Sequence, residues 1–320
     1  MVAQSDLESL LAVLQRLPDP LNIGLFVVEQ YRNKFGHYPD ILRPRTFNEK
    51  IQARKLFDRR AILATAADKY AVRAFVAARL GEAALPALHH VTTDPSDLPF
   101  AKLPHRYVVK ATHGSGWVHI VKDSAAADEA LIQGLCRSWL GQNFYDQTLE
   151  WAYRDIPPRI MVEEFLDNGA GEPAEDFKLF TFHGRVEFIQ VDVARFTEHR
   201  KSFFDRDWRP VPLRQESDNY PGPVARPANL DALIEAAETL AAGLDFVRVD
   251  LYSVQGRIYF GELTMTPGNG YFRFEPASFD ESFGRLWRMQ IGPADTAYSG
   301  AVPSAPAESA SVAAADRAVL

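Results

Sequence analysis

Between residues 108 and 118 the chain reads Val108-Val109-Lys110-Ala111-Thr112-His113-Gly114-Ser115-Gly116-Trp117-Val118. Residues 106–111 and 118–122 are rich in β-branched and aromatic side chains, which is typical of two strands joined by a turn. The glycines of the turn let backbone N–H groups approach phosphate oxygens closely, and the lysine near the end of the first strand supplies a positive charge for them. The stretch therefore predicts a hairpin with a phosphate-binding turn; an ordinary hairpin turn is the alternative.

Two other phosphate-binding patterns do not describe this stretch. A dinucleotide-binding fingerprint needs a third glycine and a helix that opens directly after the turn, and neither follows here. A Walker loop needs the pattern G-x-x-x-x-G-K, which is absent. The turn is therefore of neither the Rossmann nor the P-loop kind.

A second group of polar residues lies on a hairpin predicted over residues 246–253 and 257–264. Side chains alternate along a strand, so Arg248 and Asp250 share one face. By the same rule Glu262 and Thr264 share a face of the partner strand. Two carboxylates with a hydroxyl beside them are the hard oxygen ligands that suit magnesium when it also binds substrate phosphates. The pattern predicts a magnesium site; a charged hairpin that faces solvent is the alternative.

Acidic residues also end a strand predicted over residues 159–166. Glu163-Glu164-Phe165-Leu166 precedes a glycine-rich loop, after which Asp176 and Lys178 open a hairpin predicted over residues 176–182 and 186–193. Carboxylates can accept hydrogen bonds from an adenine amino group or from ribose hydroxyls, and a lysine can meet phosphate. Taken singly, each of these residues is also compatible with ordinary surface charge.

Taken in this order, the segments resemble the ATP-grasp superfamily from about Asp68 to Phe274. In that superfamily two lysines bind nucleotide phosphates, a glycine loop covers them, and the hinge between two subdomains holds adenine. The resemblance implies a metal site at Asp250, Glu262 and Thr264. With His113 added for its place beside the loop, the expected nucleotide-binding residues are Lys69, Lys110, His113, Gly114, Ser115, Gly116, Glu163, Glu164, Phe165, Leu166, Asp176 and Lys178.

Four shorter segments are similar to the TupA-like ATP-grasp family, whose members are associated with bacterial cell-surface polysaccharides, notably teichuronopeptide synthesis. They are Thr46-Phe47-Asn48-Glu49-Lys50-Ile51, Asp68-Lys69-Tyr70, Asp176-Phe177-Lys178 and residues 262–270. The implied fold is α+β, with two α+β subdomains that clasp ATP. The implied organisation is a helical N-terminal region (1–67), a first ATP-grasp subdomain with the phosphate-covering hairpin (68–164), a catalytic subdomain with the metal site (165–292) and a disordered tail (293–320).

The resemblance implies an enzyme that uses ATP and Mg²⁺ to join a carboxylate to an amine through an acylphosphate, releasing ADP. Lys110, Lys178 and Arg248 are the expected catalytic residues, because they would stabilise charge on the transferring phosphate. Arg273 is the expected contact for the acceptor carboxylate, and a surface arginine packed on aromatic residues is its alternative. The expected acceptor is a small molecule or a glycan-linked acid.

Three other functions are compatible with parts of the sequence. A sugar or polyol kinase on the same fold would need the same ATP residues and would differ in its product. A catalytically degraded nucleotide-binding scaffold would not need the lysines and carboxylates that this chain retains. A glycosyltransferase would need an exposed D-x-D motif, and Asp205-Arg206-Asp207 is a poor candidate because it lies in a polar loop beside Trp208.

The chain departs from the usual ATP-grasp pattern at two points. Thr264 stands where most ATP-grasp enzymes carry an asparagine as the last metal ligand, although the TupA-like family shares the threonine. A hydroxyl has a shorter reach than an amide, so a metal held there would be bound more loosely. The Rossmann-like domain that usually precedes the first subdomain is also missing, so the acceptor surface is expected to differ from that of better-known ligases.

The composition limits the possible binding partners and the expected cellular location of the protein. The 320 residues are 47% hydrophobic and 24% charged, as in an ordinary globular protein. The net charge of −7 argues against a nucleic-acid partner. Cys136 is the single cysteine, which excludes an internal disulfide, and it is expected to be a buried thiol. No secretory signal or membrane-length apolar stretch is found, so a cytoplasmic protein is expected, and ATP-grasp relatives often form homodimers.

Apolar residues at three-to-four-residue spacing predict the helices. Thr46 and Glu49 have the spacing of a capping box, in which each residue bonds to the backbone of the other at the start of a helix. The predicted helices cover residues 7–17, 21–34, 47–58, 68–80, 126–140 and 229–244.

Overall fold

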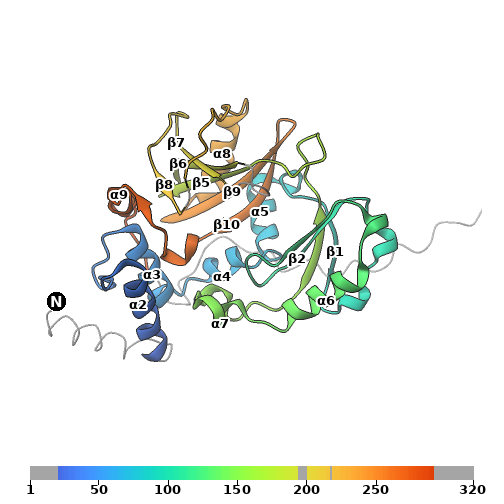
Figure 1. Cartoon of the computed structure of the whole chain (residues 1–320), viewed down its shortest axis with the longest axis horizontal. Helices are drawn as coiled ribbons and strands as arrows, with labels where there is room; N and C mark the ends of the chain where they lie inside the picture. The colour runs from blue at the N-terminus through green and yellow to red at the C-terminus, as the bar shows by residue number, and fades with distance from the viewer. Residues whose placement is uncertain (1–20, 194–199, 217, 292–320) are drawn as a thin grey trace, which may run out of the picture.

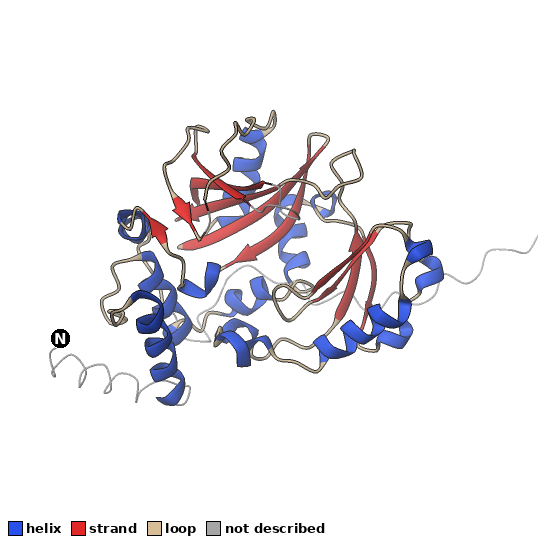
Figure 2. Cartoon of the chain, in the orientation of Figure 1, coloured by secondary structure: helices blue, strands red, loops and turns tan. Residues whose placement is uncertain are grey.

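The computed structural model describes residues 21–193, 200–216 and 218–291 of the chain (Figure 1). Two antiparallel sheets lie on opposite sides of the centre of the molecule, with helices around them (Figure 2). The helix predicted over residues 7–17 and the predicted disordered tail from residue 293 lie outside the described residues. No helix in the described part of the chain is both long and apolar enough to cross a membrane.

The smaller sheet has four strands in the order β1-β4-β2-β3, and α6 (Glu129–Leu140) packs on it. The predicted hairpin is confirmed, because Lys110 pairs with Val118 and the two strands run antiparallel. Cys136 on α6 is buried in this core, as predicted. The four strands are β1 (Leu88–Thr92), β2 (Tyr107–Ala111), β3 (Val118–Val121) and β4 (Ile160–Glu164).

The larger sheet has five strands in the order β10-β9-β5-β6-β7. Both of its predicted hairpins are confirmed, and β5 lies at its centre with β9 and β6 on either side. The strands are β5 (Asp176–Phe182), β6 (Arg185–Val193), β7 (Arg200–Asp205), β9 (Phe246–Val254) and β10 (Arg257–Thr264). A two-stranded sheet joins β8 (Arg214–Gln215) to β11 (Phe274–Glu275).

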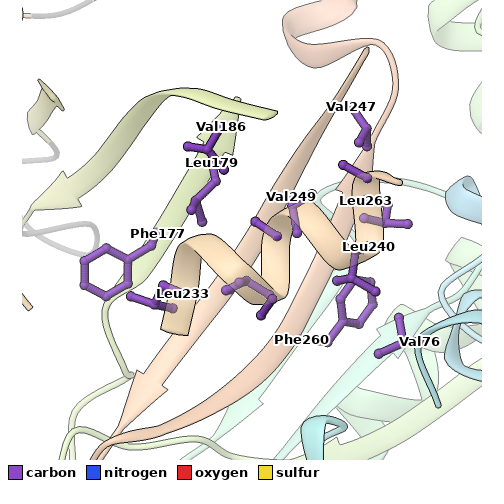
Figure 3. Close-up of a cluster of buried hydrophobic side chains, with 14 of the residues drawn as sticks. Val76, Phe177, Leu179, Val186, Leu233, Leu240, Val247, Val249, Phe260 and Leu263 are labelled. Atoms are coloured by element: carbon purple, nitrogen blue, oxygen red, sulfur yellow. The ribbon is translucent and has the colours of Figure 1, made fainter. Parts of the chain in front are cut away.

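One face of the larger sheet is apolar and forms the main core (Figure 3). Leu179 and Val249 point from this face toward α8 (Leu230–Ala241), whose Leu233 and Leu240 pack on the sheet. Helix α5 (Val72–Leu80) contributes to the same core through residues such as Val76. Because strand side chains alternate, the residues between these apolar positions point to the opposite face.

A β-bulge at Gly261 sets the faces of β10. The strand register shifts between Phe260, which packs in the main core, and Glu262. Without an extra residue these two side chains would lie on the same face, since they are two positions apart. A Cβ on Gly261 would lie 3.0 Å from the backbone oxygen of Asp250, so glycine suits this close approach. The bulge thus keeps Phe260 in the core while Glu262 points to the other face.

The N-terminal helices pack on the larger sheet. Thr46 caps α3 (Phe47–Phe57) with the predicted capping box, since its side chain accepts from the Glu49 backbone and the Glu49 carboxylate accepts from the Thr46 backbone. Phe47 joins an aromatic cluster with residues of the sheet and of α9 (Ser278–Leu286). The other α-helices among the described residues are α2 (Leu21–Phe35), α4 (Ala61–Ala67) and α7 (Phe144–Thr148).

A buried ion network fixes α3 to the sheet. The guanidinium of Arg54 donates to the carbonyls of Phe246 and Met265 at 3.0 and 3.1 Å and to the carboxylate of Asp245 at 2.6 Å. Asp58 lies 3.6 Å from the same guanidinium, and the side chains of Arg54 and Asp58 are 1% and 0% exposed. Arginine suits this position because its fork of donors satisfies several acceptors at once.

Replacing Arg54 with methionine is expected to lower the free energy of unfolding by about 3 kcal/mol or more, because buried carboxylates lose a partner. Arg60 still pairs with Asp245 at 3.0 Å, so the network is weakened but keeps a cation. Urea unfolding of Arg54→Met would measure the change. Arg43→Met is the control, because the Arg43 side chain is 82% exposed and its guanidinium lies 3.9 Å from the carboxylate of Asp40. If Arg54→Met lowers the free energy of unfolding no more than Arg43→Met does, the ion network does not stabilise the fold.

Candidate active site

Charged side chains occupy the face of the larger sheet that α8 does not cover. The register places Lys178 of β5 opposite Asp250 of β9, and Asp250 opposite Glu262 of β10. Arg248 stands opposite Thr264 in the same pair of strands. Adjacent strands therefore bring five of the predicted site residues together, and the shared faces predicted for β9 and β10 are confirmed.

Arg248 organises the carboxylates on this face. Its Nε and one terminal nitrogen donate to the two oxygens of Asp250, each at 2.7 Å, which is the strong bidentate arrangement. The same terminal nitrogen donates to the Thr264 hydroxyl at 3.0 Å, and that hydroxyl donates to Glu262 at 2.5 Å. Thr264 thus holds the orientation of Glu262 and Arg248.

The two carboxylates have different pKa values. Burial raises the pKa of Asp250 to about 6, against the lowering effect of Arg248 and Lys178. Burial acts on Glu262 in the same direction, but the cations of Lys69 and Arg248 outweigh it and lower the pKa of Glu262 to about 2. Glu262 is therefore fully ionised near neutral pH, and Asp250 is largely so.

Three lysines face these carboxylates or lie beside them. Lys110, near the end of β2, forms an ion pair with Glu163 at 2.7 Å, and Lys69 donates to the backbone oxygen of Gly114 at 2.5 Å. Burial, with the nearby Lys110 charge, lowers the pKa of Lys69. Lys178 contacts Asp176 directly. Cations from both sheets thus converge on one region, which favours an anionic ligand there.

A cleft of about 790 Å³ lies between the two sheets, which is within the size range of small-molecule sites. Its lining combines apolar side chains such as Val108 and Ile120 with the charged groups described above. Many of the residues predicted from the sequence line it, namely Lys69, Lys110, Ser115, Gly116, Glu164, Phe165, Leu166, Asp176, Lys178, Arg248, Asp250 and Glu262. A more open depression near β8 and β11 is lined by Arg214, which is already paired with Asp218 and Glu275.

Glu163 and Thr264 support the cleft without lining it. Glu163 pairs with Lys110 and with Arg73 of α5, and its side chain is 7% exposed. It therefore positions the lysine, whereas the sequence predicted a contact with the nucleotide. Thr264 was expected as a metal ligand. Its hydroxyl bonds to Arg248 and Glu262, and Thr264 itself does not line the cleft.

His113 and Arg273 lie away from the cleft lining. The His113 ring is 2% exposed and its Nε2 is 3.0 Å from the backbone oxygen of Trp139 on α6, so it packs into the small subdomain. Burial lowers the pKa of His113, which favours the neutral ring. The exposed Arg273 side chain donates to the backbone oxygen of Lys34 at 2.8 Å. Neither arrangement supports the phosphate and acceptor contacts expected from the sequence.

Asp192 is a cleft residue that the sequence analysis missed. It lies on β6, its carboxylate is 3.0 Å from Lys178, and it accepts from Gln190 at 2.7 Å. The alternation of Gln190 and Asp192 with buried Ile189 and Val191 was visible in the sequence. The missing information was the register, which places this face of β6 beside Lys178.

The donor groups on this face fit magnesium bound together with phosphates. Asp250 and Glu262 offer hard carboxylate oxygens on adjacent strands. Within the described ranges no three His, Cys, Asp or Glu side chains gather as a candidate metal group. A magnesium ion held here would therefore need phosphate or water oxygens to complete its shell, which is its usual habit in ATP-dependent enzymes.

Solved structures similar to this chain include ligases of low sequence identity. The D-alanine–D-alanine ligase from Bacillus anthracis complexed with ATP is 20% identical, with a TM-score of 0.41, and the match covers 70% of this chain and 64% of that one. An L-amino acid ligase from Bacillus licheniformis is 16% identical, with a TM-score of 0.39 and coverage of 64% and 42%. This chain therefore matches less than two thirds of the length of either ligase.

The sequence comparisons identify the family. No curated protein matches the chain significantly. A family model described as TupA-like ATPgrasp matches residues 49–288, which include both sheets and every residue that lines the cleft. The chain therefore belongs to the TupA-like ATP-grasp family and has the ATP-grasp fold.

Proposed function

We propose that this chain is an ATP-dependent, ADP-forming ligase that joins a carboxylate to an amine. The observation that carries the proposal is the charged face of the larger sheet, where Arg248, Asp250 and Glu262 meet Lys69 and other cations in one cleft. Such a site offers carboxylate ligands for a cation and lysines for phosphates in the same space. Membership of the ATP-grasp family supports ATP as the nucleotide.

The cleft residues divide the work of holding ATP. Residues 164–166 at the hinge would hold adenine, and Asp176 would accept from the ribose. Lys69, Lys110 and Lys178 would neutralise the phosphates, with the backbone of Ser115 and Gly116 above them. Magnesium held by Asp250 and Glu262 would neutralise phosphate charge when bound. Catalysis by this group of residues would consist of positioning and electrostatic stabilisation, without a protein nucleophile.

The reaction we propose has two steps. An oxygen of the acceptor carboxylate attacks the γ-phosphorus, the bond to the β-γ bridging oxygen breaks, and ADP leaves. Arg248 stabilises the negative charge that moves during this transfer. The amine nitrogen then attacks the acyl carbon, phosphate leaves with the electrons of the broken C–O bond, and the nitrogen gives up a proton. The products are an amide, ADP and phosphate.

The family context suggests the class of acceptor. TupA-like proteins are associated with cell-surface polysaccharides. A uronic acid or a glycan-linked acid is therefore the proposed carboxylate. An amino acid or a peptide amine is the proposed partner. The N-terminal helices pack where they could contribute to the acceptor surface, since α3 lies against the turn that follows β10.

ATP turnover with magnesium would test the proposal across a panel of uronic acids and amino acids. Release of ADP and phosphate that requires both an acid and an amine would support a ligase. A phosphorylated acceptor that accumulates without amine would favour the alternative sugar or polyol kinase. Absence of ATP binding by calorimetry on the same sample would refute both and favour a degraded scaffold.

A further inference from the structure

The segment between α6 and β4, residues 141–159, connects the two halves of the cleft. It contains α7 and a short 3-10 helix, η5 (Trp151–Tyr153). In Figure 1 a loop leads from α6 to α7, which is drawn directly below α4. The helix η5 packs mainly on α4 and also touches α3. The 141–159 segment thus belongs to the smaller subdomain by its place in the chain but contacts the larger one.

At one end the 141–159 segment holds the glycine turn of the β2–β3 hairpin. The ring of Trp117 lies against Gly114, where any side chain would collide with it. The same ring meets Phe144 of α7 edge to face, with centroids 5.7 Å apart, and Phe144 meets Tyr153 of η5 at 4.8 Å. Three aromatic rings in sequence therefore link the turn to η5.

At the other end the 141–159 segment holds the residues that follow β10. Glu150 accepts a hydrogen bond from Thr266, which comes two residues after the last residue of β10. Asn269 donates to the backbone oxygen of Thr148 at 3.0 Å. Glu150 is 7% exposed, so its bond lies in a desolvated environment where it contributes more than it would in water.

The end of the aromatic series lies near the larger sheet. Burial, followed by the charges of Glu150 and Glu262, raises the pKa of Tyr153 far above its usual value, so its hydroxyl stays protonated. The helix α4, on which η5 packs, also contacts β10, so η5 lies near the strand that carries Glu262. The segment therefore spans the distance between the phosphate-covering turn and the strand that carries Glu262.

We infer that Phe144 and Trp117 are positioning residues that hold the glycine turn over the phosphate end of the cleft by anchoring it to the 141–159 segment. Ser115 and Gly116 at the tip of the turn are exposed and line the cleft, whereas Trp117 behind them is packed between rings. A glycine turn loses much conformational freedom when it is ordered, so an anchor that orders it beforehand favours ligand binding. The inference rests on the proposed ATP site for its effect on function.

Phe144→Ala tests this inference by removing the central ring. Loss of one edge-to-face pair is expected to shift the equilibrium between the anchored and the released turn by up to about 10-fold. Amide hydrogen exchange of residues 113–118 is expected to become about 3- to 10-fold faster, while the amides of residues 132–139 on α6 keep their rates. The KM for ATP is expected to rise by a similar factor, with a smaller change in kcat.

Two further variants separate positioning from general destabilisation. Phe144→Tyr keeps the ring and is expected to retain the exchange rates and the KM of the unmodified chain. Leu131→Ala removes an apolar side chain that is 52% exposed on α6, and it is the control for loss of surface packing. If Phe144→Ala does not fold, Phe144→Leu replaces it as the ring-deleting variant.

The exchange measurement uses the ligand-free chain, so it does not depend on the proposed reaction. Faster exchange confined to residues 113–118, reversed in Phe144→Tyr, supports the anchor even if ATP proves not to be the substrate. Unchanged exchange at the turn, or exchange that quickens equally in α6, overturns it. Quicker exchange with an unchanged KM for ATP overturns the functional half of the inference, namely that the anchored turn assists ATP binding.

Discussion

Lys110→Met is expected to lower the rate of ATP turnover by about 10²-fold or more, the loss typical of removing one preorganised donor to developing charge. Lys110 lies near the end of β2, lines the cleft, and its side chain is 21% exposed. Glu163 holds the ammonium at 2.7 Å, so the charge is already oriented before a ligand arrives. Methionine keeps the length and the apolar stem of the side chain and removes the charge.

The fold is expected to survive this change. Glu163 retains its ion pair with Arg73, so no buried carboxylate is left unpaired. Lys122→Met is the matched control, because Lys122 follows β3 of the same hairpin and is 53% exposed in its pair with Glu172. Steady-state ATP turnover and ATP calorimetry would be measured for both variants. Equal turnover by Lys110→Met and the unmodified chain would exclude Lys110 from phosphate stabilisation.

The elements that the sequence predicted well are those with a clear period. The three hairpins have alternating or continuous β-rich residues on both sides of a glycine-bearing turn, and all three are present. The elements missed are short or carry mixed patterns. β1 is the edge strand Leu88–Thr92 with two histidines, and α4 is a helix of seven residues between breaks in the chain. The helix predicted from Asp68 begins at Val72, because the Asp68 side chain instead caps a turn at residues 69–71.

The site was predictable wherever a strand carried its residues at alternate positions. Arg248 and Asp250 followed directly from that rule, whereas Glu262 reaches the correct face only because of the bulge at Gly261. Contacts that depend on tertiary packing were not visible in the sequence. His113 was placed beside the phosphates because it adjoins the glycine turn, but its ring packs toward α6. The roles of all the site residues and the boundaries of the subdomains stay predictions.

Glu262→Gln is expected to reduce turnover by about 10²- to 10³-fold and to raise the magnesium concentration needed for half-maximal activity. The amide keeps the shape of the carboxylate and can still accept from Thr264, so the local packing is preserved. The substitution removes a negative charge. In the unmodified chain the cations of Lys69 and Arg248 lower the pKa of the Glu262 carboxyl to about 2, so it is ionised. The cleft would then hold those cations with one carboxylate fewer, and a divalent ion would bind less tightly there.

A magnesium titration of ATP turnover distinguishes loss of the metal from loss of the fold. Glu281→Gln is the control for removing one acidic charge, because Glu281 on α9 is 66% exposed and does not line the cleft. Partial recovery of Glu262→Gln at high magnesium, with the control unchanged, would show that the carboxylate acts through the cation. A low rate that no magnesium concentration improves, in a folded variant, would show that Glu262 acts on Lys69 and Arg248 instead. Full activity at the ordinary magnesium requirement would remove Glu262 from the proposed site, because the negative charge it loses is the property on which both roles depend.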